Sequence, residues 1–453
     1  MIALLDKVTA KSEKKQIVQE AYFKRAENHL SSITIRIPPE ILGYIFDLAI
    51  PREYSLHSVK EFDGLEKWSY NFLLVCHHWS QVAFSTPKLW RFWGNTFQDW
   101  NKRYHLSGNT SVDLVLNLNT HQKEELSVSL QGQLRDHITQ DNIRLIHLQD
   151  GDTHPIDPIL SLLTPNGEGI QEKKIESISF NALHSHVDLK NFFARLHLPF
   201  LQYLSIYGTF QVPLWDHPPQ TTHLTILSLD LSKSQSQTQL PPVPQLLSIL
   251  NANPNLQDLL LCGESSGRVE NTGVQVPLLH LKTINLEGEF TFMFQLLKQL
   301  QIPAMLDDTT LIMTGTTLPN ITSALVPYMQ NLFQCDLRFK EQAFVTTSFD
   351  YYFAGIAVTI FHESPTQEQQ WPTRQRWPRV KIYTYQTKPL PHTLPGPIVD
   401  LMKGVPLEYV KVLGTKYAPG MQEELFNAMP KLKYLRLENC QDLGFRTGFF
   451  FYF

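Results

Sequence analysis

The sequence RIPPEILGYIFDLAIP, from Arg36 to Pro51, is the most compact motif in the chain. Pro38 and Pro39 suit the first turn of a helix, because proline has no N–H to lose there. Glu40 then places a carboxylate where the helix dipole favours an anion. The residues behind it predict one broad apolar helix face, made of Ile41, Leu42, Ile45, Phe46 and Leu48. Pro51 predicts the end of this helix.

A second apolar segment follows an insert from Arg52 to Tyr70. It reads NFLLVCHHWSQVAFSTPKLWRFW, from Asn71 to Trp93. Pro87 predicts the end of its helix, and several aromatic residues follow. Helices this short cannot bury so much apolar surface among themselves. We therefore expect burial against another domain or a partner protein.

These blocks resemble a known family. Pro-Pro-Glu-Ile-Leu with Ile-Phe, then Leu-Leu-Val-Cys-x-x-Trp, then Ser-Thr-Pro-x-Leu-Trp, is similar to the F-box, in the F-box-like form common in large families of fungal proteins. The resemblance covers about the first fifth of the chain. It implies binding to the Skp-type adaptor of a cullin-based ubiquitin ligase, with the remaining chain acting as the substrate receptor. The insert after Pro51 is longer than the usual connection between the two helices.

The resemblance also implies which side chains face the adaptor, and they come from both helices. They are Pro38, Ile41, Leu42, Ile45, Phe46, Leu74, Val75 and Trp79. The alternative interpretation is that these side chains form the core of a small helical domain.

A different pattern follows Trp100, with apolar residues at i, i+3 and i+5, as in L-x-x-L-x-L. The clearest copies begin at Ile143, Ile175, Leu201, Leu224, Leu256, Leu281 and Leu432, and weaker ones at Leu332 and Leu407. The first six copies begin 23 to 32 residues apart, close to the period of leucine-rich repeats. In such a repeat a short strand lines one wall, a helix or loop lines the other, and the apolar side chains point between them.

Helical segments precede several of these copies. They are Leu189–Leu196, Gln245–Ala252, Phe290–Leu300 and Gln422–Ala428, and each is followed by a proline. This order resembles F-box proteins with leucine-rich repeats, although the asparagine of tighter repeats is mostly missing. Between Glu341 and Gly404 the pattern weakens, and we interpret the copies at Ile356 and Val380 as degraded repeats. The polar segment Glu363–Pro378 between them is either a contact surface or a flexible loop.

The expected fold class is α/β, with a small N-terminal helical F-box followed by a leucine-rich-repeat solenoid. The expected segments are a helical leader (1–33), the F-box-like domain (34–100), the solenoid (101–445) and an atypical aromatic tail (446–453). A solenoid needs a polar cap. We therefore expect that something covers the aromatic tail, or that the chain stops before its natural cap.

Composition excludes several classes of partner. The chain has 453 residues, a net charge of −4 and scattered basic residues, so nothing favours nucleic acid or an anionic membrane. The four cysteines are far apart, which argues against a metal clip or a disulfide framework and favours a reducing compartment. No apolar run near the N-terminus fits a signal peptide. We expect a cytoplasmic or nuclear protein, or one found in both.

No catalytic constellation is convincing. Gly263–Gly267 matches G-x-S-x-G, but a polar loop follows it where a nucleophile elbow needs a helix. The close histidine pairs, His77 with His78 and His184 with His186, lack further ligands at metal-site spacing. No phosphate-binding glycine loop is present. We expect no enzyme activity, cofactor or metal.

The expected function is that of a substrate-recognition subunit in a cullin-based ligase of the SCF type, which delivers proteins for ubiquitin-dependent degradation. It would bind the Skp-type adaptor, and through it cullin, by the F-box, and an unknown protein substrate by the repeats. The alternative is a non-catalytic scaffold or ligand-binding repeat protein that is not coupled to ubiquitination.

Overall fold

The chain forms two compact units, Met1–Val115 and Leu116–Phe453. The computed structural model describes residues 37–50, 70–94, 100–117, 143–149, 171–210, 221–232, 240–265 and 275–314 with a few gaps, the strands between 343 and 452, and a few helical residues elsewhere. The boundary between the units falls after the predicted end of the F-box-like domain at residue 100. The reason is that the first unit includes one more helix and the start of a strand.

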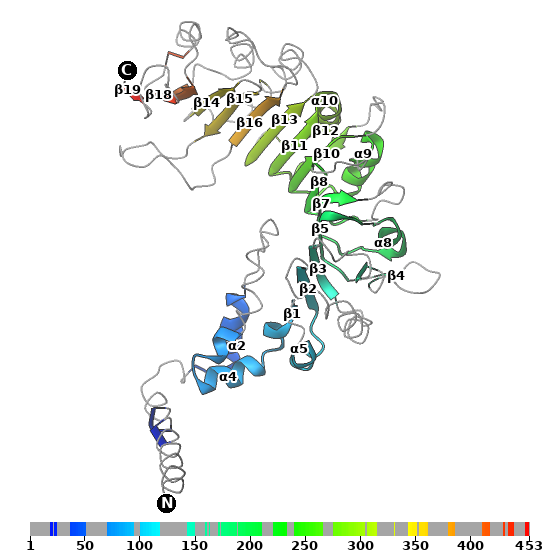
Figure 1. The fold of residues 1–453 in the computed structure, drawn as a ribbon, viewed down its shortest axis with the longest axis vertical. Helices are drawn as coiled ribbons and strands as arrows, with labels where there is room; N and C mark the ends of the chain where they lie inside the picture. Colours follow the sequence, from blue (N-terminus) through cyan, green and yellow to red (C-terminus); the bar gives the residue numbers. More distant parts are fainter. Residues whose placement is uncertain are drawn as a thin grey trace, which may run out of the picture. The chain divides into compact units, whose positions relative to one another are not determined.

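The first unit is mainly helical (Figure 1). Its elements are α2 (Pro39–Ala49), α4 (His77–Phe84), the 3-10 helix η2 (Pro87–Trp90), β1 (Phe92–Trp93), α5 (Trp100–Ser107) and β2 (Val112–Asn117). The predicted helix after Pro38 is confirmed, with proline and Glu40 in its first turn. Cys76 caps the N-terminus of α4, and its Sγ accepts a hydrogen bond from the Trp79 amide at 3.5 Å.

A small apolar core joins these helices. Its buried members are Leu42, Phe46, Ile50, Val82, Ala83, Leu89, Trp90 and Phe92. Trp90 is fully buried, and its Nε1 donates a hydrogen bond of 2.8 Å to the Ala83 carbonyl, so the indole is both packed and satisfied.

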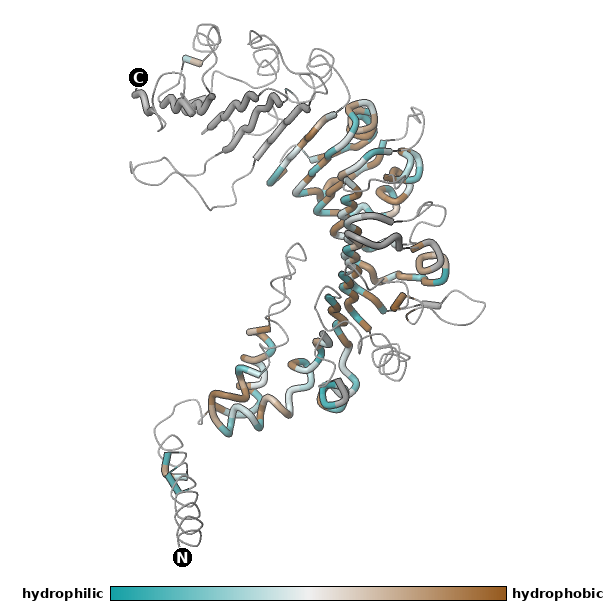
Figure 2. The backbone as a smooth tube through the Cα atoms, viewed as in Figure 1, coloured by the Kyte–Doolittle hydropathy of each residue, from teal (hydrophilic) through white to brown (hydrophobic). Residues whose placement is uncertain are grey.

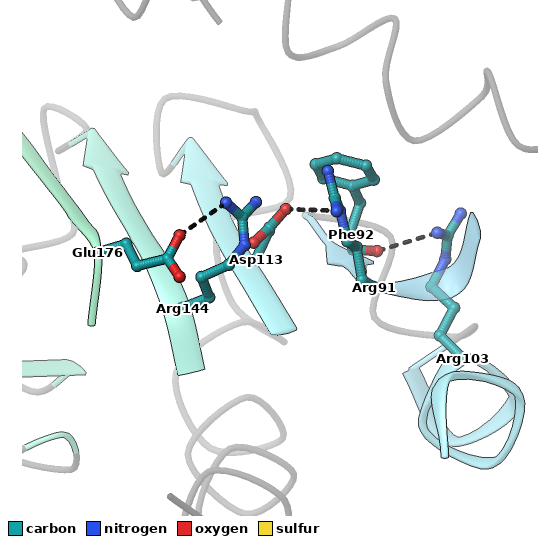
Figure 3. Close-up of polar contacts among 6 residues, drawn as sticks. All are labelled: Arg91, Phe92, Arg103, Asp113, Arg144 and Glu176. Carbon is teal, nitrogen blue, oxygen red and sulfur yellow. Dashed lines mark hydrogen bonds and ion pairs between the residues drawn. The ribbon is translucent and has the colours of Figure 1, made fainter. Parts of the chain in front are cut away.

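Charged side chains hold the end of this unit together (Figure 3). Arg103, which is completely buried, donates to the Phe92 carbonyl at 2.9 Å. Arg91 forms an ion pair of 3.0 Å with the buried carboxylate of Asp113, on the strand that pairs with β1. Buried charges are stable only when paired in this way, so we expect these contacts to fix β1 and β2.

The second unit contains a long, mostly parallel sheet, which confirms the α/β class. Its strand order is β3-β5-β7-β8-β9-β11-β13-β16-β15-β14-β17-β18-β19. The strands are β3 (Ile143–Gln149), β5 (Ser177–Val187), β7 (Tyr203–Phe210), β8 (Ile226–Asp230), β9 (Asp258–Cys262), β11 (Thr283–Glu289), β13 (Asp308–Thr314), β14 (Ala343–Asp350), β15 (Phe353–Ile360), β16 (Arg379–Tyr385), β17 (Val410–Lys416), β18 (Tyr434–Glu438) and β19 (Phe449–Tyr452).

Three helices lie along one side of the strands from β5 to β13 (Figure 1). They are α8 (Lys190–Arg195), α9 (Val243–Ala252) and α10 (Phe290–Gln299), and each confirms a predicted helical segment. Two small parallel pairs accompany them: β4 (Gln171–Glu172) with β6 (Leu196–His197), and β10 (Val276–Pro277) with β12 (Leu300–Gln301).

The apolar residues of the L-x-x-L-x-L copies stand in register across these strands. Leu204 pairs with Leu227, and Leu227 pairs with Leu259. These residues are at most 1% exposed, so they form continuous buried rows. Hydrophobic residues recur along the strands and helices that are coloured by hydropathy in Figure 2. Each buried leucine contributes roughly 1.5–3 kcal/mol, so we expect the stacking of the strands to supply much of their stability.

Two of these strands contain a glycine at a position where the backbone of a neighbouring strand or turn comes very near. Gly208 has a φ of 112°, and a Cβ there would collide with the Ala182 carbonyl. A Cβ on Gly288 would collide with the Gly263 carbonyl. Both glycines lie two residues after the last apolar position of a copy, one residue before the position at which tighter repeats carry their asparagine.

The region between Glu341 and Gly404, where the repeat pattern weakens, differs from the prediction. Strand β15 is antiparallel to both β14 and β16, so the copy at Ile356 is not a repeat of the parallel series, and that interpretation was wrong. Strand β16 is parallel to β13, as a repeat requires. The copy at Leu332, the segments 363–378 and 422–428, and most of the leader and of the insert after Pro51 lie outside the described residues.

Candidate partner-binding surface on helix α2

Helix α2 packs one side against the rest of its unit. Leu42 and Phe46 are 0% exposed on that side. The Phe46 ring lies 4.3 Å from the Phe72 ring and 5.1 Å from the Trp79 ring, measured between centroids. Leu42 and Phe46, which were expected to face an adaptor, therefore lie in the core of this unit.

The opposite side of α2 presents apolar residues to solvent. We call it the α2 outer face, and it consists of Ile41, Tyr44, Ile45 and Leu48. The spacing i, i+3, i+4, i+7 places these side chains in one stripe along the helix. Ile41 is 53% exposed and Tyr44 60% exposed, whereas side chains of this kind usually gather in the interior.

Of the other residues predicted to face an adaptor, three are exposed to solvent and one is half-buried against the core. Pro38 is exposed, and so are Leu74 and Val75 in the turn before α4, with Leu74 at 82%. Trp79 is half-buried against the core cluster. No described residue accepts a hydrogen bond from its indole N–H, and Trp79 therefore serves mainly as packing for Phe46.

Several contacts hold α2 in place. Lys88 donates to Asp47 at 2.9 Å, and the ring of His78 lies 3.4 Å from the Ile37 carbonyl oxygen. Gly43 allows a close approach, because a Cβ there would lie 3.3 Å from Thr86 Oγ1. The Lys88 pair is solvent-exposed and contributes little energy, so the buried aromatic contacts carry most of the positioning.

The chemistry of the α2 outer face is that of a docking surface. Its only polar atom is the Tyr44 hydroxyl, and the helix has no basic residue in its last turn. A helix that is apolar on both sides is normally covered on both. Sequence reasoning missed Tyr44, although its position three residues after Ile41 was a usable signal.

Ser265, the serine of the G-x-S-x-G match, has a structural role. Its Oγ donates to the Pro241 carbonyl at 3.3 Å, and its backbone forms an isolated bridge with Leu240. Within the described residues, no group of three or more His, Cys, Asp or Glu side chains is arranged to hold a metal ion.

None of the described helices has the length and apolar character needed to cross a bilayer. Comparison of the chain with family models, curated proteins and solved structures found no match.

Proposed function

We propose that the chain is the substrate-recognition subunit of a cullin-based ubiquitin ligase of the SCF type. In this proposal the α2 outer face, together with Leu74 and Val75, binds the Skp-type adaptor, and the first unit is an F-box-like domain. The second unit is a leucine-rich-repeat solenoid that binds the substrate. In this proposal the chain acts by holding the substrate near the conjugating enzyme, which raises the effective concentration of the substrate there.

The observation that supports this proposal is the exposed apolar stripe on a firmly held helix. Contiguous exposed apolar side chains mark protein-binding surfaces, and large side chains at the centre of such a surface supply most of the affinity. The stripe lies within the segment whose sequence resembles the F-box.

A binding assay with purified Skp-type adaptor tests the proposal. The variant Ile45→Asp/Leu48→Asp should bind the adaptor at least about tenfold more weakly, because a carboxylate buried in an apolar interface loses its hydration without gaining a partner. Both positions are exposed, so the variant should keep the circular dichroism spectrum and melting temperature of the parent.

Gln81→Asp is the matched control. Gln81 is exposed on α4, a different helix from the one that carries the stripe, so this variant adds a carboxylate to the same unit without changing the stripe. The proposal is rejected if the folded parent does not bind the adaptor, or if the control loses as much affinity as the stripe variant. Capture of cullin through the adaptor would separate a ligase subunit from an uncoupled scaffold.

A further inference from the structure

The residues that alternate with the buried apolar rows lie on the other face of the sheet in the second unit, which we call the open face. On it Asp230 and Glu287 are half-buried, whereas Gln149 and Cys262 are buried. One row on this face runs across consecutive strands from β3 to β11. We call it the Asp230 row, and pairing register defines it as Gln149, Asn181, Tyr207, Asp230, Cys262 and Glu287. Neighbouring strands lie about 4.8 Å apart, so the row extends over about 24 Å.

The charges on the open face have one sign. Its carboxylates between β3 and β13 are Asp230, Asp258, Glu287, Glu289 and Asp308, and none of the described residues of this face in these strands is a lysine or arginine. Asp230 and Glu287 flank Cys262 in the row. Burial raises the pKa of Glu287, and the nearby charge of Asp230 raises it further. These two carboxylates therefore repel each other without a compensating cation from the described strands.

An independent observation at the start of the row also indicates a missing donor. Gln149 is only 8% exposed, yet no described residue donates a hydrogen bond to its Oε1. Asn181, next in the row, also has an Oδ1 without a donor among the described residues. A buried acceptor without a hydrogen-bond donor destabilises the fold, so a ligand that carries N–H groups would be bound favourably here.

We propose that the Asp230 row binds an extended, lysine- and arginine-rich segment of a protein partner. The row supplies acceptors along a line, which fits an extended chain of about seven residues at 3.3 Å each. Ammonium and guanidinium groups carry several N–H donors and the opposite charge. Tyr207 adds an aromatic surface next to Asp230. A single metal ion fits less well, because no described cluster has a metal-binding arrangement.

This inference rests on the proposed function, since it describes the class of substrate that the repeats would recognise. The test uses the full chain and fluorescein-labelled octalysine, with a Gly-Ser peptide of equal length as the uncharged probe, in a fluorescence anisotropy titration. The parent should bind octalysine at least about tenfold more tightly than the Gly-Ser probe, and the affinity should fall as salt is added.

The variant Asp230→Asn/Glu287→Gln should reduce octalysine affinity about tenfold, because it removes the charges and keeps the shapes. Its matched control is Glu264→Gln/Asp307→Asn, which changes the net charge equally at exposed carboxylates outside the strands. The single substitutions Asp230→Asn and Glu287→Gln, each expected to cost about threefold, replace the double variant if it does not fold.

The proposal would be overturned if the parent bound octalysine and the Gly-Ser peptide with equal affinity. It would also be overturned if Glu264→Gln/Asp307→Asn lost as much octalysine affinity as Asp230→Asn/Glu287→Gln. The adaptor assay uses a different surface, so the two proposals can fail separately. If Asp230→Asn/Glu287→Gln loses octalysine binding and keeps adaptor binding, the result supports the Asp230 row as the peptide-binding site. A parent that binds octalysine and no adaptor would reject only the ligase function.

Discussion

At the scale of single residues, His147 is the clearest case of burial acting on a titratable group. It lies on the open face of β3, only 3% exposed, and pairs in register with the uncharged Ser179. Burial lowers its pKa from 6.5 to about 4, because a charged imidazole would lose its hydration there. The folded chain therefore binds fewer protons at His147 than the unfolded chain between these two pH values.

The stability of the folded chain should therefore depend on pH in this range. Because the folded-state pKa is depressed, the contribution of neutral His147 is complete above pH 6.5 and is lost as the pH falls towards 4. The loss amounts to roughly 3 kcal/mol, from 1.36 kcal/mol per pH unit. Urea unfolding at several pH values should show a smaller fall in unfolding free energy for His147→Asn than for the parent.

His223 provides the control for this experiment, because it is an exposed histidine in the same unit. His223→Asn removes an imidazole without changing a buried site. If both variants and the parent lose the same unfolding free energy on acidification, burial of His147 does not contribute to the pH dependence of stability.

At the scale of elements, one buried asparagine joins the end of α9 to the strand before it. The Asn253 side chain accepts a hydrogen bond from the Leu224 amide at 2.9 Å. It donates to the Ile249 carbonyl at 2.8 Å and to the Thr221 hydroxyl at 3.2 Å. It therefore satisfies a backbone carbonyl at the helix end and also fixes the position of the segment before β8.

Asn253→Ala should lower the unfolding free energy by about 3 kcal/mol, because it leaves buried donors and acceptors without partners. Asn255→Ala is the matched control, since Asn255 is exposed in the same Asn-Pro-Asn turn and should cost less than about 0.5 kcal/mol. Chemical unfolding of both variants measures the difference. Similar values for the two would show that the Asn253 contacts are not stabilising.

The sequence predicted that α2 exists but not which way it faces. Proline and Glu40 set its start, and these local signals were sufficient. Its apolar residues extend around much of the helix, so periodicity alone could not separate Leu42 and Phe46, which face the core, from Ile41 and Ile45, which face solvent. That distinction depends on Phe72 and Trp79, which come from elsewhere in the chain.

The parallel strands were predicted well, because each copy of L-x-x-L-x-L carries its own buried residues. The reversed direction of β15 could not be predicted, since alternating apolar residues look alike in parallel and antiparallel strands. The Asp230 row was also missed. Its members are far apart in sequence, and only the register of the sheet brings Gln149, Asp230 and Glu287 into one line.

At the scale of the whole molecule, the chain divides into two units, and the first has a core of its own around Leu42 and Phe46. Two cores predict two unfolding transitions in differential scanning calorimetry. Leu42→Ala leaves a cavity in the first core and should cost about 3 kcal/mol. Gly288→Ala forces a Cβ against the Gly263 carbonyl in the second unit and should cost roughly 1–3 kcal/mol.

Each substitution should therefore lower the melting temperature of one transition and leave the other in place. Ile41→Ala is the control for the first unit, because Ile41 neighbours Leu42 on the same helix but is exposed, and its removal should shift neither transition by much. A single transition that moves with both Leu42→Ala and Gly288→Ala would show that the units unfold as one. In that case a substitution on α2 would also weaken the open face, and the adaptor and peptide assays would have to be compared at equal stability.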